Sequence, residues 1–109
     1  MISGYGGSKM TAFGVVRFRP KSGRHEEFEN LFRNLPRNFE GLRKFSLIKT
    51  ADGTYCSIGE WDSFDHMVAA RPKMIGNLDT FRHTLDDFGD DRGVTDAISG
   101  EAIIEISFS

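Results

Sequence analysis

Two kinds of hydrophobic repeat alternate along this chain, and their order constrains the fold more than any other feature. Residues 24–35 carry apolar side chains at the three- and four-residue spacings of an amphipathic helix. The same repeat recurs in its strongest form between Met74 and Phe88. Other segments favour extended chain, most clearly where apolar and polar residues alternate. They predict strands at 11–19, 42–50, 54–61 and 97–108.

Prolines and turn residues mark the boundaries in the first half of the chain. Pro20 ends the first strand and Pro36 ends the first helix, because proline lacks the backbone N–H that both structures use. Asp52-Gly53 predicts a tight hairpin, since these residues tolerate the positive φ angles of such turns. The first half is therefore expected to read strand, helix, strand, strand.

The second half is expected to begin with two helices. Asp62 suits the N-cap of a short helix at 63–70. Pro72 breaks that helix and suits the first turn of a new one. The new helix is expected to run to Phe88, with Gly89 as its terminating residue.

The resulting order, β-α-β-β-α-α-β, is that of a split βαβ or ferredoxin-like α+β fold. It predicts one antiparallel sheet with helices on a single face. The other face would still carry large apolar side chains, which is more apolar surface than a solvated sheet normally exposes. We therefore expect two sheets to pack face to face in a homodimeric α/β barrel. The candidates for the buried face are Phe13, Val15, Tyr55, Trp61 or their neighbours.

Composition limits the chain to one folded unit. Residues 11–109 suffice for a single domain with a real core, and residues 1–10 are expected to be a flexible leader. The single cysteine, Cys56, excludes an internal disulfide. No stretch approaches the roughly 20 apolar residues of a membrane span. The default expectation is a soluble cytoplasmic protein that does not bind membranes.

Charge is nearly balanced overall but unevenly distributed. The net charge of −2 is too small to indicate a nucleic-acid partner. Residues 1–50 carry ten Lys or Arg and four Asp or Glu, whereas residues 51–109 carry four and twelve. This asymmetry fits solvated faces, complementary subunits in a dimer or a polyanion-binding arm. The scattered positions of the basic residues favour the first.

One set of motifs resembles a known family. The motifs are Pro20-x-x-Gly23 after the first strand, the Asp52-Gly53 hairpin and Glu60-Trp61-Asp62-Ser63 at a strand–helix junction. Together with the late helix before a terminal strand, they resemble the antibiotic biosynthesis monooxygenase family over residues 11–108. The resemblance implies a dimeric α/β barrel. It also implies, for some members, cofactor-independent oxygenation of phenolic or quinol-type compounds.

The same resemblance argues against one branch of the family. Its haem-degrading members use an Asn on the first strand and a Trp within the helix after the third strand. This chain has no Asn at 11–19, and its Trp61 lies at the end of the strand instead. Haem degradation is therefore not expected, and no cofactor or metal is expected either.

A cofactor-free oxygenase needs a pocket with aromatic walls and a donor or cation beside the oxyanion that forms. A histidine could serve as the base, because its side chain titrates near neutral pH. The candidate catalytic residues are Trp61, Asn77 and His66; the candidate substrate-binding residues are Tyr55, Arg17, Arg71 and Arg82.

Each candidate also has an ordinary structural alternative. Trp61 and Tyr55 could simply pack in the core. Asn77 could hold its helix to a loop through a hydrogen bond. For Arg17 and Arg82, the alternative is an ion pair with a nearby carboxylate.

The leading hypothesis is a cofactor-independent monooxygenase acting on a small aromatic or quinol-type compound. The alternative is a non-catalytic, small-ligand-binding or stress-associated barrel, and an isomerase of the muconolactone type is a third option. An RNA-binding module is not expected, because residues 52–58 match the pattern of such modules only at its glycine. Convergence of Trp61, Asn77 and an Arg or His on one closed cavity would favour the oxygenase over the binding protein.

Overall fold

The structure is a computed structural model, and it describes residues 10–108. Residues 1–9 of the expected leader lie outside the described residues. A short 3₁₀ turn, η1, covers Arg82–Thr84. The other elements are β2 (Ala12–Phe18), α1 (His25–Arg33), β3 (Leu42–Lys49), β4 (Tyr55–Trp61), α2 (Phe64–Phe81) and β5 (Asp96–Glu101).

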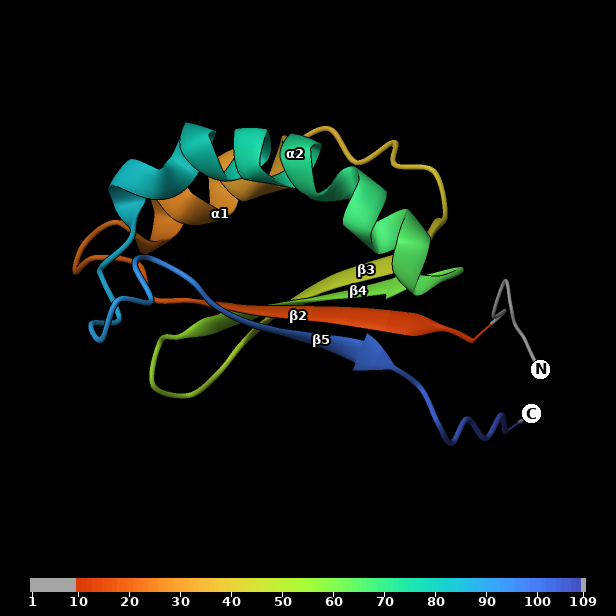
Figure 1. The fold of residues 1–109 in the computed structure, drawn as a ribbon. Coiled ribbons are helices and arrows are strands. Elements are labelled where there is room, and N and C mark those ends of the chain that lie inside the picture. Colours follow the sequence, from red (N-terminus) through yellow and green to blue (C-terminus); the bar gives the residue numbers. More distant parts are fainter. Residues whose placement is uncertain (1–9, 109) are drawn as a thin grey trace.

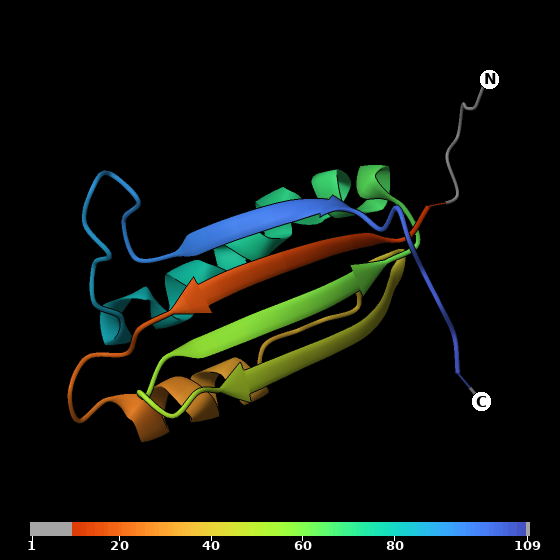
Figure 2. The same cartoon turned by 90° about the horizontal axis from the view of Figure 1, so that it is seen from below.

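The strands of residues 10–108 form one antiparallel sheet in the order β3-β4-β2-β5. Both α-helices cover the same face of this sheet (Figure 1). Figure 2 views the sheet from the other side, where the four strands lie side by side without a covering helix. This arrangement confirms the ferredoxin-like α+β fold.

Strand register decides which residues face the helices. Residues paired across an antiparallel sheet point to the same side. Trp61 pairs with Ala12 and Tyr55 pairs with Phe18, and all four are buried in the clusters beneath the helices. Of the residues expected on the uncovered face, Tyr55 and Trp61 therefore belong to the helix-covered side.

The uncovered face is apolar along its middle. Val15 of β2 pairs with Ile58 of β4 on one side and with Ile98 of β5 on the other. Phe13 lies two residues before Val15 and shares its face. Ile98 is 72% exposed. The structure thus leaves a row of large apolar side chains without a cover from the described residues.

The prediction of two helices at 63–70 and 72–88 is wrong. α2 is one continuous helix with Pro72 inside it, and its N-cap is Ser63, which accepts a hydrogen bond from His66 N, rather than Asp62. A proline removes the hydrogen bond to the carbonyl four residues earlier, here that of Val68. Pro72 and Val68 are both exposed, so water can satisfy that carbonyl.

α2 also ends earlier than the hydrophobic repeat predicts. After η1, Leu85 adopts an extended conformation and forms a β-bridge with Pro20, the residue that follows the first strand by two positions. Leu85 and Phe88 are buried as the repeat requires. They are buried by packing of a non-helical segment, however, which helical spacing alone cannot distinguish from a helix.

The last strand is likewise shorter than the expected 97–108. β5 is an edge strand that pairs only with β2, and Glu101 lies opposite Ala12, the first residue of β2. One further hydrogen bond, from Ala102 N to Thr11 O at 2.8 Å, continues this pairing beyond β5. The chain then leaves the sheet (Figure 1), and its large apolar side chains are exposed. These are Ile103, Ile104, Ile106 and Phe108.

Candidate functional site

A cavity of about 420 Å³ lies between the helices and the covered face of the sheet. Its size falls within the roughly 300–1,000 Å³ typical of small-molecule sites. Its walls are mainly aromatic and aliphatic, and among the described residues that line it there is no Asp, Glu, Lys or His. The aromatic lining residues are Phe18, Phe32, Phe39, Phe45, Trp61 and Phe81, and the polar ones are Arg37, Ser57, Arg71, Asn77, Thr95 and Ser99.

Trp61 forms one wall at the end of β4. Its side chain is only 2% exposed and packs against Phe39, with ring centroids 6.0 Å apart. The indole fits because Gly59 and Gly14, paired across β4 and β2, leave room beneath it. A Cβ atom at Gly59 would lie 3.0 Å from the indole nitrogen.

The indole N–H of Trp61 has no hydrogen-bond acceptor among the described residues. Among those residues, no fully buried side-chain nitrogen or oxygen lacks a partner. The indole nitrogen is therefore reached from the cavity that Trp61 lines. Its N–H is a donor that a bound molecule can use.

Ser57 lies on the same face of β4, two positions after Tyr55, and is 4% exposed. Its hydroxyl makes no hydrogen bond to a described residue and lines the cavity. Sequence reasoning did not single it out. Side chains alternate along a strand, so the face that carries Tyr55 and Trp61 also carries Ser57. This alternation could have identified Ser57 from the sequence.

Two candidates on α2 also line the cavity. The Asn77 side-chain nitrogen donates to the Pro36 carbonyl at 3.0 Å, which is the helix-to-loop bond named above as its structural alternative. Arg71 is exposed and lines the cavity, and it forms no hydrogen bond or ion pair with a described residue. The structure thus brings Trp61, Asn77 and Arg71 to one cavity.

Arg37 is a second arginine at this cavity, and sequence reasoning missed it. Its guanidinium donates to the carbonyls of Phe32, Arg33 and Leu35 at the end of α1. It also lies over the rings of Phe32 and Phe45, 5.1 and 5.3 Å from their centroids. Burial lowers its pKa from the ordinary arginine value. A cation suits the carbonyl end of a helix, which explains this position.

Tyr55 is the most deeply buried of the candidates that lie outside this cavity. Its hydroxyl hydrogen-bonds the Glu29 carboxylate of α1, and Lys49 lies 5.6 Å from its ring centroid. Burial, and then the hydrogen bond and negative charge of Glu29, raise the pKa of the Tyr55 phenol. Tyr55 lines a separate, shallow hollow between α1 and β3.

His66 and Arg82 also lie outside the cavity. The His66 ring nitrogen Nδ1 is 2.7 Å from Ser63 Oγ, and its Nε2 is 3.9 Å from Glu40. Arg82 forms an ion pair with Asp79 at 2.9 Å, which is the structural role named for it as the alternative to substrate binding.

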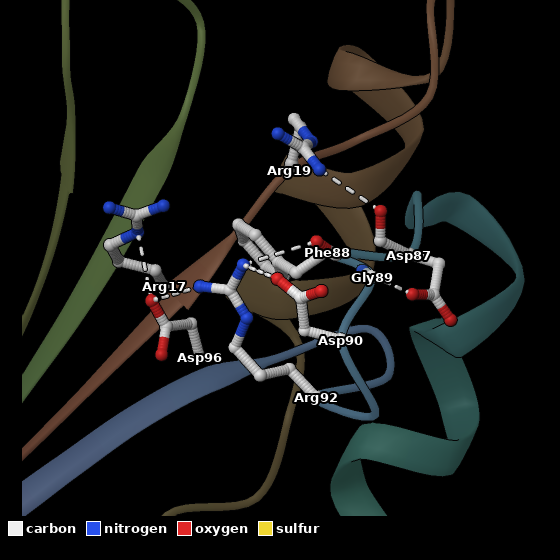
Figure 3. Close-up of polar contacts among 8 residues, drawn as sticks. All are labelled: Arg17, Arg19, Asp87, Phe88, Gly89, Asp90, Arg92 and Asp96. Atoms are coloured by element: carbon white, nitrogen blue, oxygen red, sulfur yellow. Dashed lines mark hydrogen bonds and ion pairs between the residues drawn. The ribbon is translucent and has the colours of Figure 1, made fainter.

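Arg17 projects from the opposite face of the sheet into a cluster around Phe88 (Figure 3). It lies 3.7 Å from Asp96, and its guanidinium is 5.2 Å from the Phe88 ring centroid. Arg19 and Arg92 approach the same ring, at 4.6 and 5.7 Å. Arg92 also pairs with Asp96 at 3.4 Å. The cluster fastens the segment between α2 and β5 to β2, which gives Arg17 a structural role.

Comparison with known proteins identifies the family to which the chain belongs. The family model "Antibiotic biosynthesis monooxygenase" matches residues 12–72, which is more than half of the chain. The chain belongs to the antibiotic biosynthesis monooxygenase family. The search of curated proteins found no match.

Solved structures of this type superpose on the chain at low sequence identity. A variant of SnoaB, a cofactor-independent oxygenase from Streptomyces nogalater, is 18% identical with a TM-score of 0.69, covering 88% of this chain and 96% of that one. Rv0793 from Mycobacterium tuberculosis is 17% identical with a TM-score of 0.70, covering 89% and 99%. A dimeric ferredoxin-like protein from an uncultured marine organism is 11% identical with a TM-score of 0.71, covering 92% and 94%. At these identities the likeness establishes the fold alone.

The described residues contain neither a metal-binding cluster nor a membrane-spanning helix. No group of three or more His, Cys, Asp or Glu side chains is placed to hold a metal ion. No helix in residues 10–108 is long and apolar enough to span a membrane.

Proposed function

We propose that this protein is a cofactor-independent monooxygenase that oxidises a small aromatic or quinol-type compound in the cavity beside Trp61. The observation that carries the proposal is the indole N–H of Trp61, a buried donor that points at no described acceptor. Ser57 and Arg71 add a free hydroxyl and a free cation to the same cavity. Membership of the family and the likeness to a cofactor-independent oxygenase support the same reaction type.

The proposed chemistry uses electrons from the substrate alone. An electron-rich phenol or anthrone loses a proton, and the resulting anion reacts with O₂. For an anthrone, the ring CH₂ becomes C=O, one oxygen atom enters the product, and the other leaves as water with both hydrogens. The Trp61 N–H and the Arg71 guanidinium stabilise the anionic oxygen in a cavity that excludes bulk water.

No histidine or carboxylate among the described residues lines the cavity, so the chain offers no evident general base there. The proposed substrate must therefore be acidic enough to lose its proton to water once its anion is stabilised. The same observation favours the second candidate function, a barrel that binds an aromatic ligand without turning it over.

We further propose that the protein is a homodimer formed through the uncovered face of the sheet. Val15, Ile58 and Ile98 form an apolar row across that face, and burying it against a second copy removes it from water. Sedimentation should give about twice the subunit mass of 12.3 kDa. Ile58→Lys should convert the dimer to monomer, and a wild-type monomer at micromolar concentration would contradict this assembly.

The reaction is tested by O₂ uptake with the purified, metal-stripped protein and a panel of hydroquinones, anthrones and catechols. Uptake should exceed autoxidation and fall by about tenfold or more in Trp61→Phe, because an oxyanion donor is lost. Arg82→Gln, which alters an exposed ion pair away from the cavity, is the matched control and should retain full uptake. Uptake equal to that of buffer, together with saturable binding of the same compounds, would establish the binding protein instead.

A further inference from the structure

The exposed residues of the cavity lining mark its mouth. Ile75 of α2 is 57% exposed, Ser99 of β5 is also exposed on the helix-covered face, and both line the cavity. Arg71 is the third exposed residue at this place, one helical turn before Ile75. Ser57 and Trp61, in contrast, are almost fully buried and form the inner end. A molecule that fills the cavity therefore has one end inside and one end near Arg71.

The helix positions next to Arg71 carry no negative charge. The helix neighbours that could reach it, three and four positions away, are Met67, Val68, Met74 and Ile75. All four are apolar. Arg82, near the end of the same helix, pairs with Asp79 instead. Arg71 is thus an exposed cation within an apolar rim, and it pairs with no described carboxylate.

The rest of the cavity carries the same sign of charge. Arg37 brings a second guanidinium to the lining, and its bonds are to backbone carbonyls, not to a carboxylate. With no Asp or Glu in the described lining, neither arginine faces a carboxylate in the cavity. Such a site disfavours a cationic ligand and favours an anionic one.

We infer that the natural ligand is an aromatic acid whose ring body fills the cavity and whose carboxylate binds Arg71 at the mouth. A guanidinium presents paired N–H donors that match the two oxygens of a carboxylate. Aromatic walls and the inner polar groups at Ser57 and Trp61 receive the ring end. The inference rests on the cavity of the proposed function but concerns binding rather than turnover, so the two can fail separately.

Three anthraquinones that differ only in their substituent test the inference: the 2-carboxylate, the neutral 2-hydroxymethyl compound and the cationic 2-aminomethyl compound. Trp61 is the only tryptophan of the chain and lines the cavity, so quenching of its fluorescence reports binding at this place. The carboxylate should bind about tenfold more tightly than the alcohol, and the amine most weakly. High salt should narrow the differences among the three compounds, because it screens both the attraction of the carboxylate and the repulsion of the amine.

Variants then assign the preference to Arg71. Arg71→Gln should make the carboxylate and the alcohol bind equally, Arg71→Lys should restore part of the difference, and Arg82→Gln should leave it unchanged. Equal binding of the three probes to the wild-type protein would overturn the inference. So would an Arg71→Gln variant that weakens the carboxylate and the alcohol by the same factor. Failure of the oxygenase proposal is distinguishable, because it appears as absent O₂ uptake with the charge preference intact.

Discussion

The two ends of β4 each place a buried aromatic side chain beneath the helices, but only one of these side chains has a hydrogen-bond partner for its polar atom. Tyr55 begins the strand, and its hydroxyl is hydrogen-bonded to Glu29 of α1. Trp61 ends the strand equally buried, yet its N–H meets no described acceptor and borders a cavity. Buried polar groups are normally paired within the protein. The difference therefore separates an end whose polar group is paired within the protein from an end whose donor stays open to the cavity.

The end of β4 at Tyr55, here called the closed end, should tolerate truncation of a buried side chain less well than the end at Trp61. Phe28 is fully buried there and packs against the rings of Phe18 and Tyr55, with centroids 5.7 and 4.7 Å away. Phe28→Ala should lower the free energy of unfolding by about 3–5 kcal/mol, because it opens a void in packed aromatic side chains. Urea denaturation measures this change.

The matched variant at the open end is Met67→Ala, since Met67 is equally buried but lines the cavity. Met67→Ala should lower the free energy of unfolding by about 2 kcal/mol, near the lower limit for truncating a buried side chain to alanine. The loss is small because the substitution enlarges a space that already exists. Equal losses in Phe28→Ala and Met67→Ala would erase the proposed difference between the two ends.

A smaller effect should follow from filling the space beneath the indole. In Gly59→Ala, the new Cβ would lie 3.0 Å from the Trp61 nitrogen and would push the ring toward the cavity. We expect a net loss of about 1 kcal/mol, because the strain exceeds the roughly 0.5–1 kcal/mol gained by replacing glycine. Trp61 fluorescence and urea denaturation report the ring shift and the stability.

Gly76→Ala is the control, because a Cβ there meets no atom within 4 Å and the residue lies inside α2. It should instead stabilise the protein by about 0.5–1 kcal/mol. If Gly59→Ala stabilised the protein to the same extent, the close fit of the indole would not exist in solution.

The sequence predicted the shared face of Tyr55 and Trp61, because side chains alternate along a strand. It could not predict which of them borders a cavity. That depends on Glu29, which comes from α1 and is 26 residues from Tyr55 in the chain. The same limit applies to Arg37, whose place at the cavity follows from the path of the chain after α1. Leu85 and Phe88 show the converse. Their helical spacing was real, but Leu85 is placed by its β-bridge to Pro20 and Phe88 by the arginines that pack on its ring.

The smallest predicted effect is on the pH dependence of stability, and it tests the closed end alone. Tyr55→Phe removes the hydroxyl bound to Glu29 and should cost about 1 kcal/mol at neutral pH, the usual net value of one hydrogen bond. The pKa of Tyr55 is raised above its ordinary value of 10.0, so the folded protein holds this proton more tightly than the unfolded chain does. The resulting stability is complete below pH 10 and is lost as the pH rises beyond it.

Wild-type stability should therefore fall more steeply above pH 10 than that of Tyr55→Phe, and urea denaturation at pH 8 and pH 11 measures the two slopes. Parallel slopes would mean that the Tyr55 hydroxyl is as open to solvent as that of an ordinary tyrosine. In that case the closed end would not be sealed by Glu29. The contrast between a paired Tyr55 hydroxyl and an unpaired Trp61 N–H would then no longer hold.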